Sequence, residues 1–258
     1  MPMPETTNPF SLKEKIILIT GASSGIGKQC AISCSQMGAN IIGLGRNEER
    51  LKETLDLCSN PGSHFIYSVD LTDYEMTREK IDEILSNHTK IDGMINSAGI
   101  STTSPFKLSS PDKMEHFIQT NVTSALNLVR LAHKKKLLNP GSSIVFLASV
   151  MGMVGEIGKT MYGMTKGALI AATKSMALEF ASKNIRVNCL SPGVVETPLS
   201  KKSYYSQDEK LLEHVKSNHP LGLGKPEDIA LACIYLLSDA SSWMTGANIP
   251  LDGGYTAR

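Results

Sequence analysis

The stretch that decides the fold is "KIILITGASSGIG" (residues 15–27), in which a short apolar run leads directly into a glycine-rich turn. Gly21, Gly25 and Gly27 have a G-x-x-x-G-x-G spacing, and a segment of helical period follows. Such a turn lets backbone N–H groups approach a phosphate, and the positive end of the helix dipole favours its charge. A tight strand-to-helix loop is the alternative. It is weakened because open α/β sheets bind nucleotides at this first strand-to-helix position.

The same alternation of apolar runs and helical segments continues along the chain, which is typical of repeated βαβ units. The predicted strands are 15–20, 40–45, 64–70, 93–99, 142–149, 185–193 and 246–252. The predicted helices lie near 25–37, 47–58, 74–88, 111–135, 160–182, 207–217 and 226–238, several with breakers at their ends such as Asn139-Pro140-Gly141. The runs are almost continuously apolar, as expected for strands buried on both faces. The pattern predicts an α/β fold, a Rossmann-like doubly wound sheet of about seven parallel strands with helices on both faces.

The domain organisation is expected to be simple. Residues 1–12 are rich in proline and predicted to be flexible, and residues 13–258 show no break in composition that would indicate a second domain. The polar segment 196–220, which carries Tyr204 and Tyr205, is predicted to be a lid over a ligand site.

Charge and cysteine usage exclude several classes of function. Lys plus Arg number 26 against 25 Asp plus Glu, so the net charge of +1 gives no reason to expect nucleic acid or an anionic membrane as a partner. No apolar stretch approaches the roughly 20 residues of a membrane helix, and no signal segment precedes the first strand. The five cysteines form no CxxC pair and no cluster with histidine at metal-ligand spacing. We therefore expect a cytoplasmic protein without a metal site that binds a small ligand.

The ends of the second and third predicted strands bear on a nucleotide ligand. In dinucleotide-binding folds an acid at the end of the second strand bonds the ribose 2′-hydroxyl, whereas a basic residue suits a 2′-phosphate. Here Gly45 stands in place of the acid and Arg46 follows, which favours NADP over NAD. A solvated arginine at the start of a helix is the alternative. Asp70 could accept a hydrogen bond from adenine or cap the next helix, and the sequence leaves both open.

A phenol, an ammonium and a hydroxyl form the second candidate group. Tyr162 and Lys166 are four residues apart on a predicted helix, and Ser149 ends the fifth strand thirteen residues upstream. A phenol with an unperturbed pKa near 10 is a poor base unless a neighbouring cation favours phenolate, and Lys166 can supply that charge. The Ser149 hydroxyl can steady a substrate oxygen on which negative charge develops. Taken alone, a lysine over a tyrosine ring is an ordinary surface contact.

Six motifs in the same order resemble the single-domain short-chain dehydrogenases/reductases. They are "TGASSGIG" (20–27), "NSAG" (96–99), "QTNVTSAL" (119–126), Ser149 with "YGMTK" (162–166), "SPGVVET" (191–197) and "GANIPLDGG" (246–254). The resemblance implies a tetrad of Asn121, Ser149, Tyr162 and Lys166, with Tyr162 as the acid/base. It also implies that Asn121 holds a water linking Lys166 to solvent, although from the sequence this residue could merely kink or cap its helix. The implied cofactor-binding residues are Gly21, Ser23, Ser24, Gly25, Ile26, Gly27, Arg46, Asp70, Leu71, Asn96, Ala98, Gly99, Tyr162, Lys166, Pro192, Gly193, Val195 and Thr197.

The resemblance implies an NADP(H)-dependent oxidoreductase that interconverts a carbonyl and a secondary alcohol, and a homotetramer. The 3-oxoacyl-[acyl-carrier-protein] reductases are the most similar subgroup, so the substrate is expected to be a small molecule or linked to an acyl carrier. Lys134–Lys136 and Lys183 could attract an acidic carrier or be solvated surface. A sugar, polyol or other secondary-alcohol dehydrogenase and a non-catalytic NADP sensor or scaffold are the alternatives. The sequence departs from the family pattern at Ser97, where asparagine is common, and at Leu223, where many members carry arginine.

Overall fold

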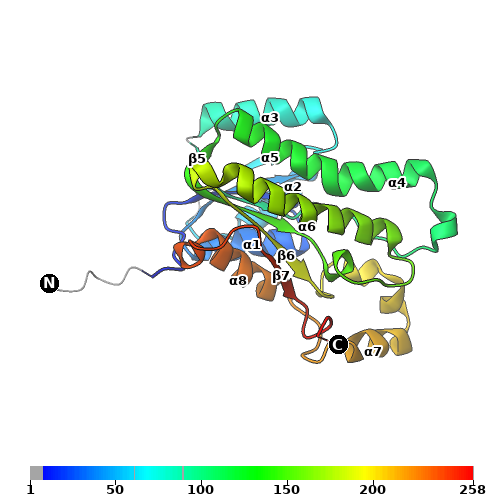
Figure 1. Ribbon diagram of the computed structural model, residues 1–258. Coiled ribbons are helices and arrows are strands. Elements are labelled where there is room, and N and C mark those ends of the chain that lie inside the picture. Colours follow the sequence, from blue (N-terminus) through cyan, green and yellow to red (C-terminus); the bar gives the residue numbers. More distant parts are fainter. Residues whose placement is uncertain (1–7, 61, 89, 258) are drawn as a thin grey trace.

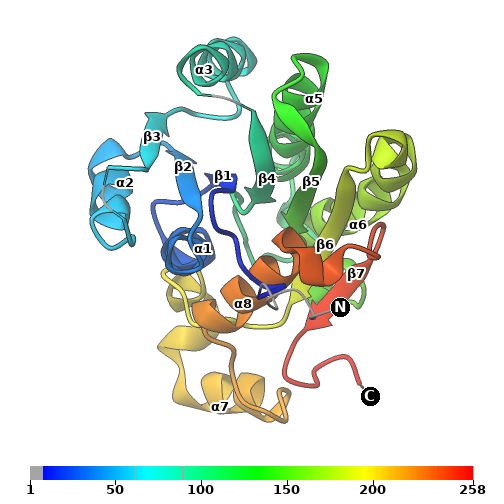
Figure 2. The ribbon, with the colours of Figure 1, turned by 90° about the vertical axis from the view of Figure 1, so that its left-hand side faces the viewer.

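Seven parallel strands form one sheet in the computed structural model, which describes residues 8–60, 62–88 and 90–257. The strands are β1 Ile16–Thr20, β2 Asn40–Gly45, β3 Phe65–Ser68, β4 Ile91–Asn96, β5 Leu138–Leu147, β6 Arg186–Pro192 and β7 Asn248–Leu251. Figure 1 shows the sheet with helices packed against it. The strand order is β3-β2-β1-β4-β5-β6-β7, so the direction of winding reverses between β1 and β4 (Figure 2). A ligand crevice is expected at this switch point, outside the carboxyl ends of the strands. The predicted fold class is confirmed.

Helices cover both faces of the sheet. They are α1 Gly25–Gln36, α2 Glu48–Leu55, α3 Tyr74–Asn87, α4 Pro111–Ile118, α5 Ser124–Lys134, α6 Thr160–Phe180, α7 Glu209–Ser217 and α8 Pro226–Leu237. Figure 2 shows α3, α5 and α6 on one face and α1, α2 and α8 on the other. In the described part of the chain, no helix is long and apolar enough to cross a membrane.

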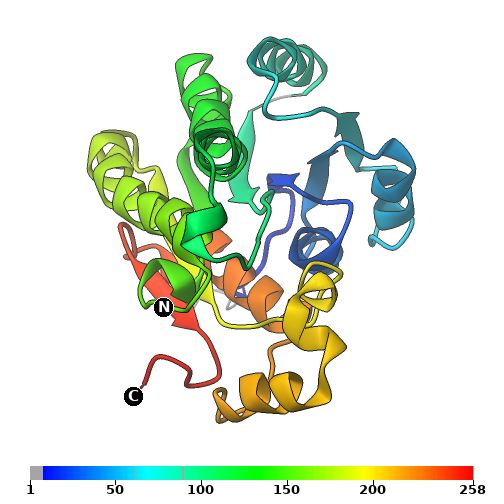
Figure 3. The same cartoon turned by 90° about the vertical axis from the view of Figure 1, so that its right-hand side faces the viewer.

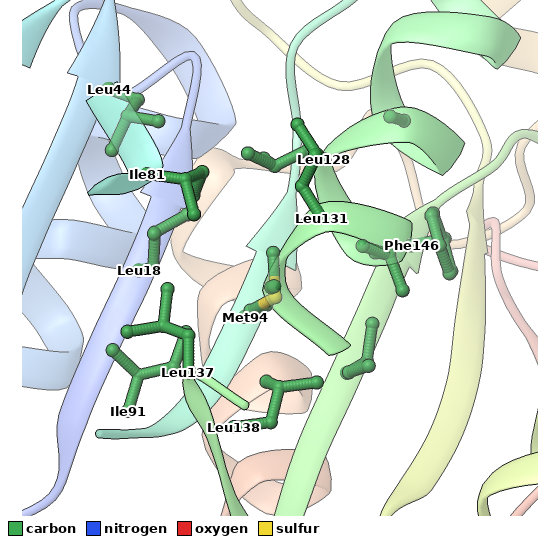
Figure 4. Close-up of a cluster of buried hydrophobic side chains, with 14 of the residues drawn as sticks. Leu18, Leu44, Ile81, Ile91, Met94, Leu128, Leu131, Leu137, Leu138 and Phe146 are labelled. Atoms are coloured by element: carbon green, nitrogen blue, oxygen red, sulfur yellow. The ribbon is translucent and has the colours of Figure 1, made fainter. Parts of the chain in front are cut away.

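Two apolar clusters explain why the strands read as continuous apolar runs. Leu18, Met94 and Phe146 point to the side of α5, together with Leu128 and others (Figure 4). Their neighbours along the same strands, such as Ile17, Ile95 and Val145, are buried in the second cluster on the side of α1 and α8. Because successive side chains of a strand point to opposite faces, a strand covered on both faces must be apolar at nearly every position.

The structure corrects two expected boundaries. Asn139-Pro140-Gly141 does not separate a helix from the fifth strand but lies inside β5, where the pairing with β4 shifts register between Ile91 and Gly93. Gly141 there has φ +84°, a conformation that glycine adopts without strain. The single helix expected over 111–135 is α4 and α5 joined by a π-type turn, Gln119–Thr123.

The expectation of a flexible segment over residues 1–12 does not hold for its last part. Leu12 is fully buried, its N–H donates to Met37 O, and Ala240 N–H donates to Pro9 O. Phe10 also lies against the ring of Tyr235. Residues 1–7 lie outside the described residues.

Candidate active site

The glycine-rich turn between β1 and α1 is shaped for a phosphate group. Gly21 and Gly25 have φ values of +68° and +55°, and a Cβ on Gly27 would lie 2.4 Å from Gly21 O. Ser24 is the N-cap of α1, but its side chain makes no capping hydrogen bond, and the first turn holds no acid. The first N–H groups of a helix have no partner within the helix. They are therefore left for an anionic ligand, and the turn fits the pyrophosphate of a dinucleotide.

Loops that follow β1, β4 and β6 meet at this turn. Thr20 Oγ1 accepts from the N–H groups of Ser97 and Ala98, both at 3.0 Å. A Cβ on Gly21 would lie 3.1 Å from Ala98 N, and one on Gly25 would lie 3.5 Å from Thr197. The sequence-predicted cofactor residues from three distant segments are thus brought to one edge of the sheet.

Asn96 at the end of β4 is an orphaned polar side chain. It is 3% exposed, and among the described residues neither its amide nitrogen nor its oxygen has a hydrogen-bond partner. Leaving a buried polar group unpaired costs free energy, so such a group needs an explanation such as an absent ligand or water. Asn96 therefore adds a second feature that fits a bound nucleotide at this edge.

The ends of β2 and β3 lie apart from the centre of the site. Arg46 is exposed, and its Nη1 is 3.8 Å from Asp70 Oδ2. A Cβ on Gly45 would be 3.4 Å from Ser23 Oγ, an ordinary contact distance, so this position lies directly beside the turn. The N-cap of α3 is Asp73, and this excludes the capping role for Asp70. Although burial opposes ionisation of Asp70, hydrogen bonds from Thr72 outweigh it and lower the carboxyl pKa. Leu71 beside it is buried.

A cavity of about 380 Å³ opens at the carboxyl ends of β4, β5 and β6. Its size is in the range of small-molecule sites. Nine predicted site residues line it: Ile26, Gly99, Ser149, Tyr162, Lys166, Pro192, Gly193, Val195 and Thr197. Ser203, Tyr205 and Val215 of the predicted lid line it as well. Figure 3 shows α7 and the turns before it, in yellow to gold, at this end of the molecule.

Two glycines, Gly152 and Gly163, bring Ser149 to the face of α6 that carries Tyr162. Ser149 precedes the 3₁₀ turn Val150–Gly152, and its Oγ accepts from Met151 N–H. A Cβ on Gly163 would lie 2.6 Å from Met151 O, and one on Gly152 would lie 2.7 Å from Gly167 N. The small residues of "MYGMTKG" therefore serve close approach of this turn to the helix. As a result, Ser149 and Tyr162 line the same cavity.

Burial shifts the pKa values of Tyr162 and Lys166 in opposite directions. Burial raises the pKa of Tyr162 to about 12 against the lowering effect of the Ser149 hydrogen bond, and Tyr205 nearby raises it further. Burial lowers the pKa of Lys166 to about 8. Lys166 Nζ donates to Leu147 O at 2.6 Å and lies 5.6 Å from the centre of the Tyr162 ring. Burial therefore makes the phenol a weaker acid than usual, and the phenolate that the spacing of Lys166 favours stays a prediction.

Asn121 lies in the π-type turn and joins two segments of the site. Its Oδ1 accepts from Ile100 N–H at 2.8 Å, and its Nδ2 donates to Ile100 O and to Thr165 Oγ1. Both amide hydrogens are therefore used within the protein, and the side chain fixes the loop after β4 to α6. The water that the family resemblance assigns to Asn121 stays a prediction.

Two residues of the site had no place in the sequence-based prediction. Lys159 lines the cavity three residues before Tyr162, a helical spacing that the sequence does show. His219, at the end of the lid, is 3% exposed; its Nε2 accepts from Val194 N–H, and its Nδ1 donates to Val215 O. It thereby joins α7 to the loop after β6. No local pattern indicates this contact, because it depends on how two distant segments pack.

Comparisons with known proteins agree with this geometry. The family model described as enoyl-(acyl carrier protein) reductase matches residues 21–256. The 3-oxoacyl-[acyl-carrier-protein] reductase of Thermotoga maritima is 34% identical over 245 residues, covering 94% of this chain and 98% of the relative. A short-chain type dehydrogenase/reductase from Mycobacterium marinum superposes with a TM-score of 0.89 at 31% identity, covering 97% of this chain and 98% of that one. A gluconate 5-dehydrogenase from Burkholderia cenocepacia, solved with NADP and tartrate, has a TM-score of 0.89 at 27% identity and the same coverage.

Proposed function

The chain belongs to the short-chain dehydrogenase/reductase family of nicotinamide-dependent oxidoreductases, and we propose that it interconverts a carbonyl compound and a secondary alcohol with NADP(H). The observation that carries the proposal is that Ser149, Tyr162 and Lys166 line one cavity, which Ile26 of the phosphate-binding turn also lines.

The residues that would hold the cofactor follow from the fit described above. The N–H groups at the start of α1 would bind the pyrophosphate, and Arg46 would bind the adenosine 2′-phosphate. The side-chain amide of Asn96 would find its missing hydrogen-bond partner in the bound cofactor. Lys166 holds ribose hydroxyls, and the loop Pro192–Thr197 contacts the nicotinamide. When bound, NADP(H) supplies or accepts the hydride at the reacting carbon.

Tyr162 and Ser149 carry the proton chemistry. A phenol with a pKa of about 12 retains its proton at neutral pH, so Tyr162 donates to a carbonyl oxygen on which negative charge develops. The Ser149 hydroxyl steadies the same oxygen. The segment 196–220 acts as a lid that excludes water.

Two substrate classes are supported by different relatives. The relative from Thermotoga maritima supports a 3-oxoacyl thioester, in particular one linked to an acyl carrier protein. The relative solved with NADP and tartrate is a gluconate 5-dehydrogenase and supports a sugar-derived or polyol substrate.

The test of the activity is NADPH oxidation with a 3-oxoacyl thioester, 3-oxo esters and simple ketones, together with NADP⁺ reduction by sugar acids and polyols. Tyr162→Phe should lose at least about a hundredfold in kcat, since general acid catalysis contributes roughly 10²–10⁴. The matched control is Tyr74→Phe, which alters a phenol on α3 that is 39% exposed. NADPH binding by both variants, measured by fluorescence, shows that the site is intact. Equal turnover by the two variants would contradict the assignment of Tyr162.

The preference for NADP is tested separately. Arg46→Ala should raise KM for NADPH by about tenfold while changing KM for NADH little, because a charge-assisted hydrogen bond is worth roughly 1.5 kcal/mol or more. Arg78→Ala, on an exposed arginine of α3 that pairs with Glu75, is the control. If Arg46→Ala affects both cofactors alike, the arginine does not select the phosphate.

Assembly as a homotetramer is part of the proposal. Leu178 and Met164 are 81% and 46% exposed on α6, which supports contact between copies through this helix. Light scattering of the purified protein tests the assembly.

A further inference from the structure

Lys159 is a second ammonium group at the ring of Tyr162. Its Nζ lies 5.8 Å from the ring centre, and that of Lys166 lies 5.6 Å from it. The two lysines stand three residues before and four residues after Tyr162, so they approach the ring from opposite ends of one helix face. The proposed function uses Lys166 for the cofactor. It gives Lys159 no task.

The Lys159 ammonium lacks a strong partner in the described part of the chain. No hydrogen bond and no ion pair within 4 Å involves its Nζ there, whereas Lys166 Nζ donates to Leu147 O. Lys159 is half-buried in the cavity wall, and this burial lowers its pKa. A lysine on an open surface keeps its hydration and its rotamer freedom. Burial of Lys159 in the cavity wall therefore costs free energy of desolvation and side-chain entropy, unless a bound anion offsets that cost.

The charges around the cavity leave room for an anion. Besides the two lysines, Glu156 is the charged side chain among the described residues that line it. Glu156 is exposed and attracts Lys159 only at a distance, because the two form no ion pair. Two histidines also line it: His214 is exposed on α7, and His219 is fixed by hydrogen bonds, since its Nε2 accepts from Val194 N–H and its Nδ1 donates to Val215 O. Lys159 is thus the cation that faces the substrate space.

The position of Lys159 at the start of α6 is also unfavourable for the helix. Lys159 is the N-cap of this helix, its side chain makes no capping hydrogen bond, and the first turn holds no acid. Serine, threonine, aspartate or asparagine would be preferred at an N-cap, and a cation is unfavourable at the positive end of a helix dipole. The lysine therefore does not stabilise the helix that it begins.

We propose that Lys159 binds a carboxylate of the substrate, which is thus a small oxo acid or hydroxy acid whose reacting carbon lies a few atoms from that carboxylate. The inference rests on the proposed function, because the reacting oxygen is placed at Tyr162 and Ser149. It also decides between the two substrate classes, since a 3-oxoacyl thioester has no carboxylate near its ketone. A carboxylate at Lys159 gains a charge-assisted hydrogen bond in a partly desolvated cavity.

The test compares acids with their esters. NADPH oxidation is measured with 3-oxobutanoate and 4-oxopentanoate, each beside its ethyl ester, for the wild type and three variants. Lys159→Gln should lower the acid-to-ester ratio of kcat/KM by about tenfold or more for at least one pair, mainly through KM. Glu156→Gln should raise the ratio about twofold, because it removes a like charge at the edge of the cavity. Lys174→Gln removes an equal charge from an exposed position of α6 and should leave the ratio unchanged.

Each other outcome overturns the inference. If the wild type reduces the esters or other ketones but neither of the acids, or if the acid-to-ester ratio of Lys159→Gln equals that of Lys174→Gln, Lys159 does not bind a carboxylate and the proposed function stands. If the wild type reduces neither acids nor esters nor any other carbonyl compound, the proposed function fails together with this inference. Thermal unfolding and NADPH binding of each variant separate a loss of the carboxylate contact from a loss of structure.

Discussion

Substitution of Gly163 by alanine tests the close packing that brings Ser149 to Tyr162. The new Cβ would lie 2.6 Å from Met151 O, so the turn Val150–Gly152 must move away from α6 by about 0.8 Å to reach an ordinary contact distance near 3.4 Å. Overpacking of this kind costs roughly 1–3 kcal/mol, and the better helix propensity of alanine returns up to about 1 kcal/mol. Gly167→Ala on the same helix is the matched control, because its Cβ would meet Gly152 O at 3.5 Å.

Because both variants gain the same helix propensity, their difference isolates the steric cost. We expect the free energy of unfolding in urea to be about 1–3 kcal/mol lower for Gly163→Ala than for Gly167→Ala. We also expect kcat of Gly163→Ala to fall by about a hundredfold, since displacement of a reacting group by about 1 Å can cost that much. If the two variants are equally stable and equally active, the turn is not held by contact with Gly163, and the argument for how Ser149 is placed is wrong.

Two more predictions concern buried groups of the site. Because burial lowers the pKa of Lys166 to about 8, burying its charge destabilises the folded protein at pH 7, and this cost disappears as the pH rises from about 8 toward 10.5. Between pH 7 and 9.5, the free energy of unfolding of the wild type should therefore rise by about 2 kcal/mol relative to that of Lys166→Met, as measured in urea. A gap that is constant with pH would contradict this. His219→Phe leaves Val194 N–H and Val215 O without their partner, so it should lower the free energy of unfolding by about 1–3 kcal/mol and change KM for the substrate. The control His64→Phe removes a hydrogen bond to Ile41 N–H in β2 and should alter stability without altering KM. A normal KM in His219→Phe would show that the loop after β6 holds its shape without this histidine.

Much of the fold and the site could be predicted because the signals are local. The turn after β1 has its glycines at fixed positions, and the strands are apolar at nearly every residue because both faces are covered. The four residues of the expected tetrad come from three segments: the π-type turn before α5 holds Asn121, the end of β5 leads to Ser149, and α6 carries Tyr162 and Lys166. The parallel order of the strands places the end of β5 at the edge of the sheet where a ligand is expected.

The predictions that were wrong or missing concern residues whose structure depends on contacts between distant segments rather than on local sequence. The sequence "NPG" within 139–141 is typical of a break, but pairing with β4 keeps these residues in a strand. Residues 8–12 have no pattern of their own and are held by Met37 and Ala240. His219 is visible in the sequence only as one polar residue in a polar segment. Its role requires Val194 and Val215, which are brought to it by the fold.

The pair Tyr162 and Lys166 shows that spacing along a helix does not by itself determine the charge of two groups. The i,i+4 spacing places an ammonium near the phenol, and proximity alone would favour phenolate. Burial acts on both groups at once and disfavours the charged form of each, so the pKa of Tyr162 rises to about 12 while that of Lys166 falls to about 8. A phenol with a raised pKa is a weaker acid than a free phenol, so Tyr162 gives up its proton only as negative charge develops on the oxygen that it contacts. Oxidation of an alcohol requires the deprotonated phenol, so kcat in that direction should rise with pH above neutral, as a pH profile of NADP⁺ reduction would show.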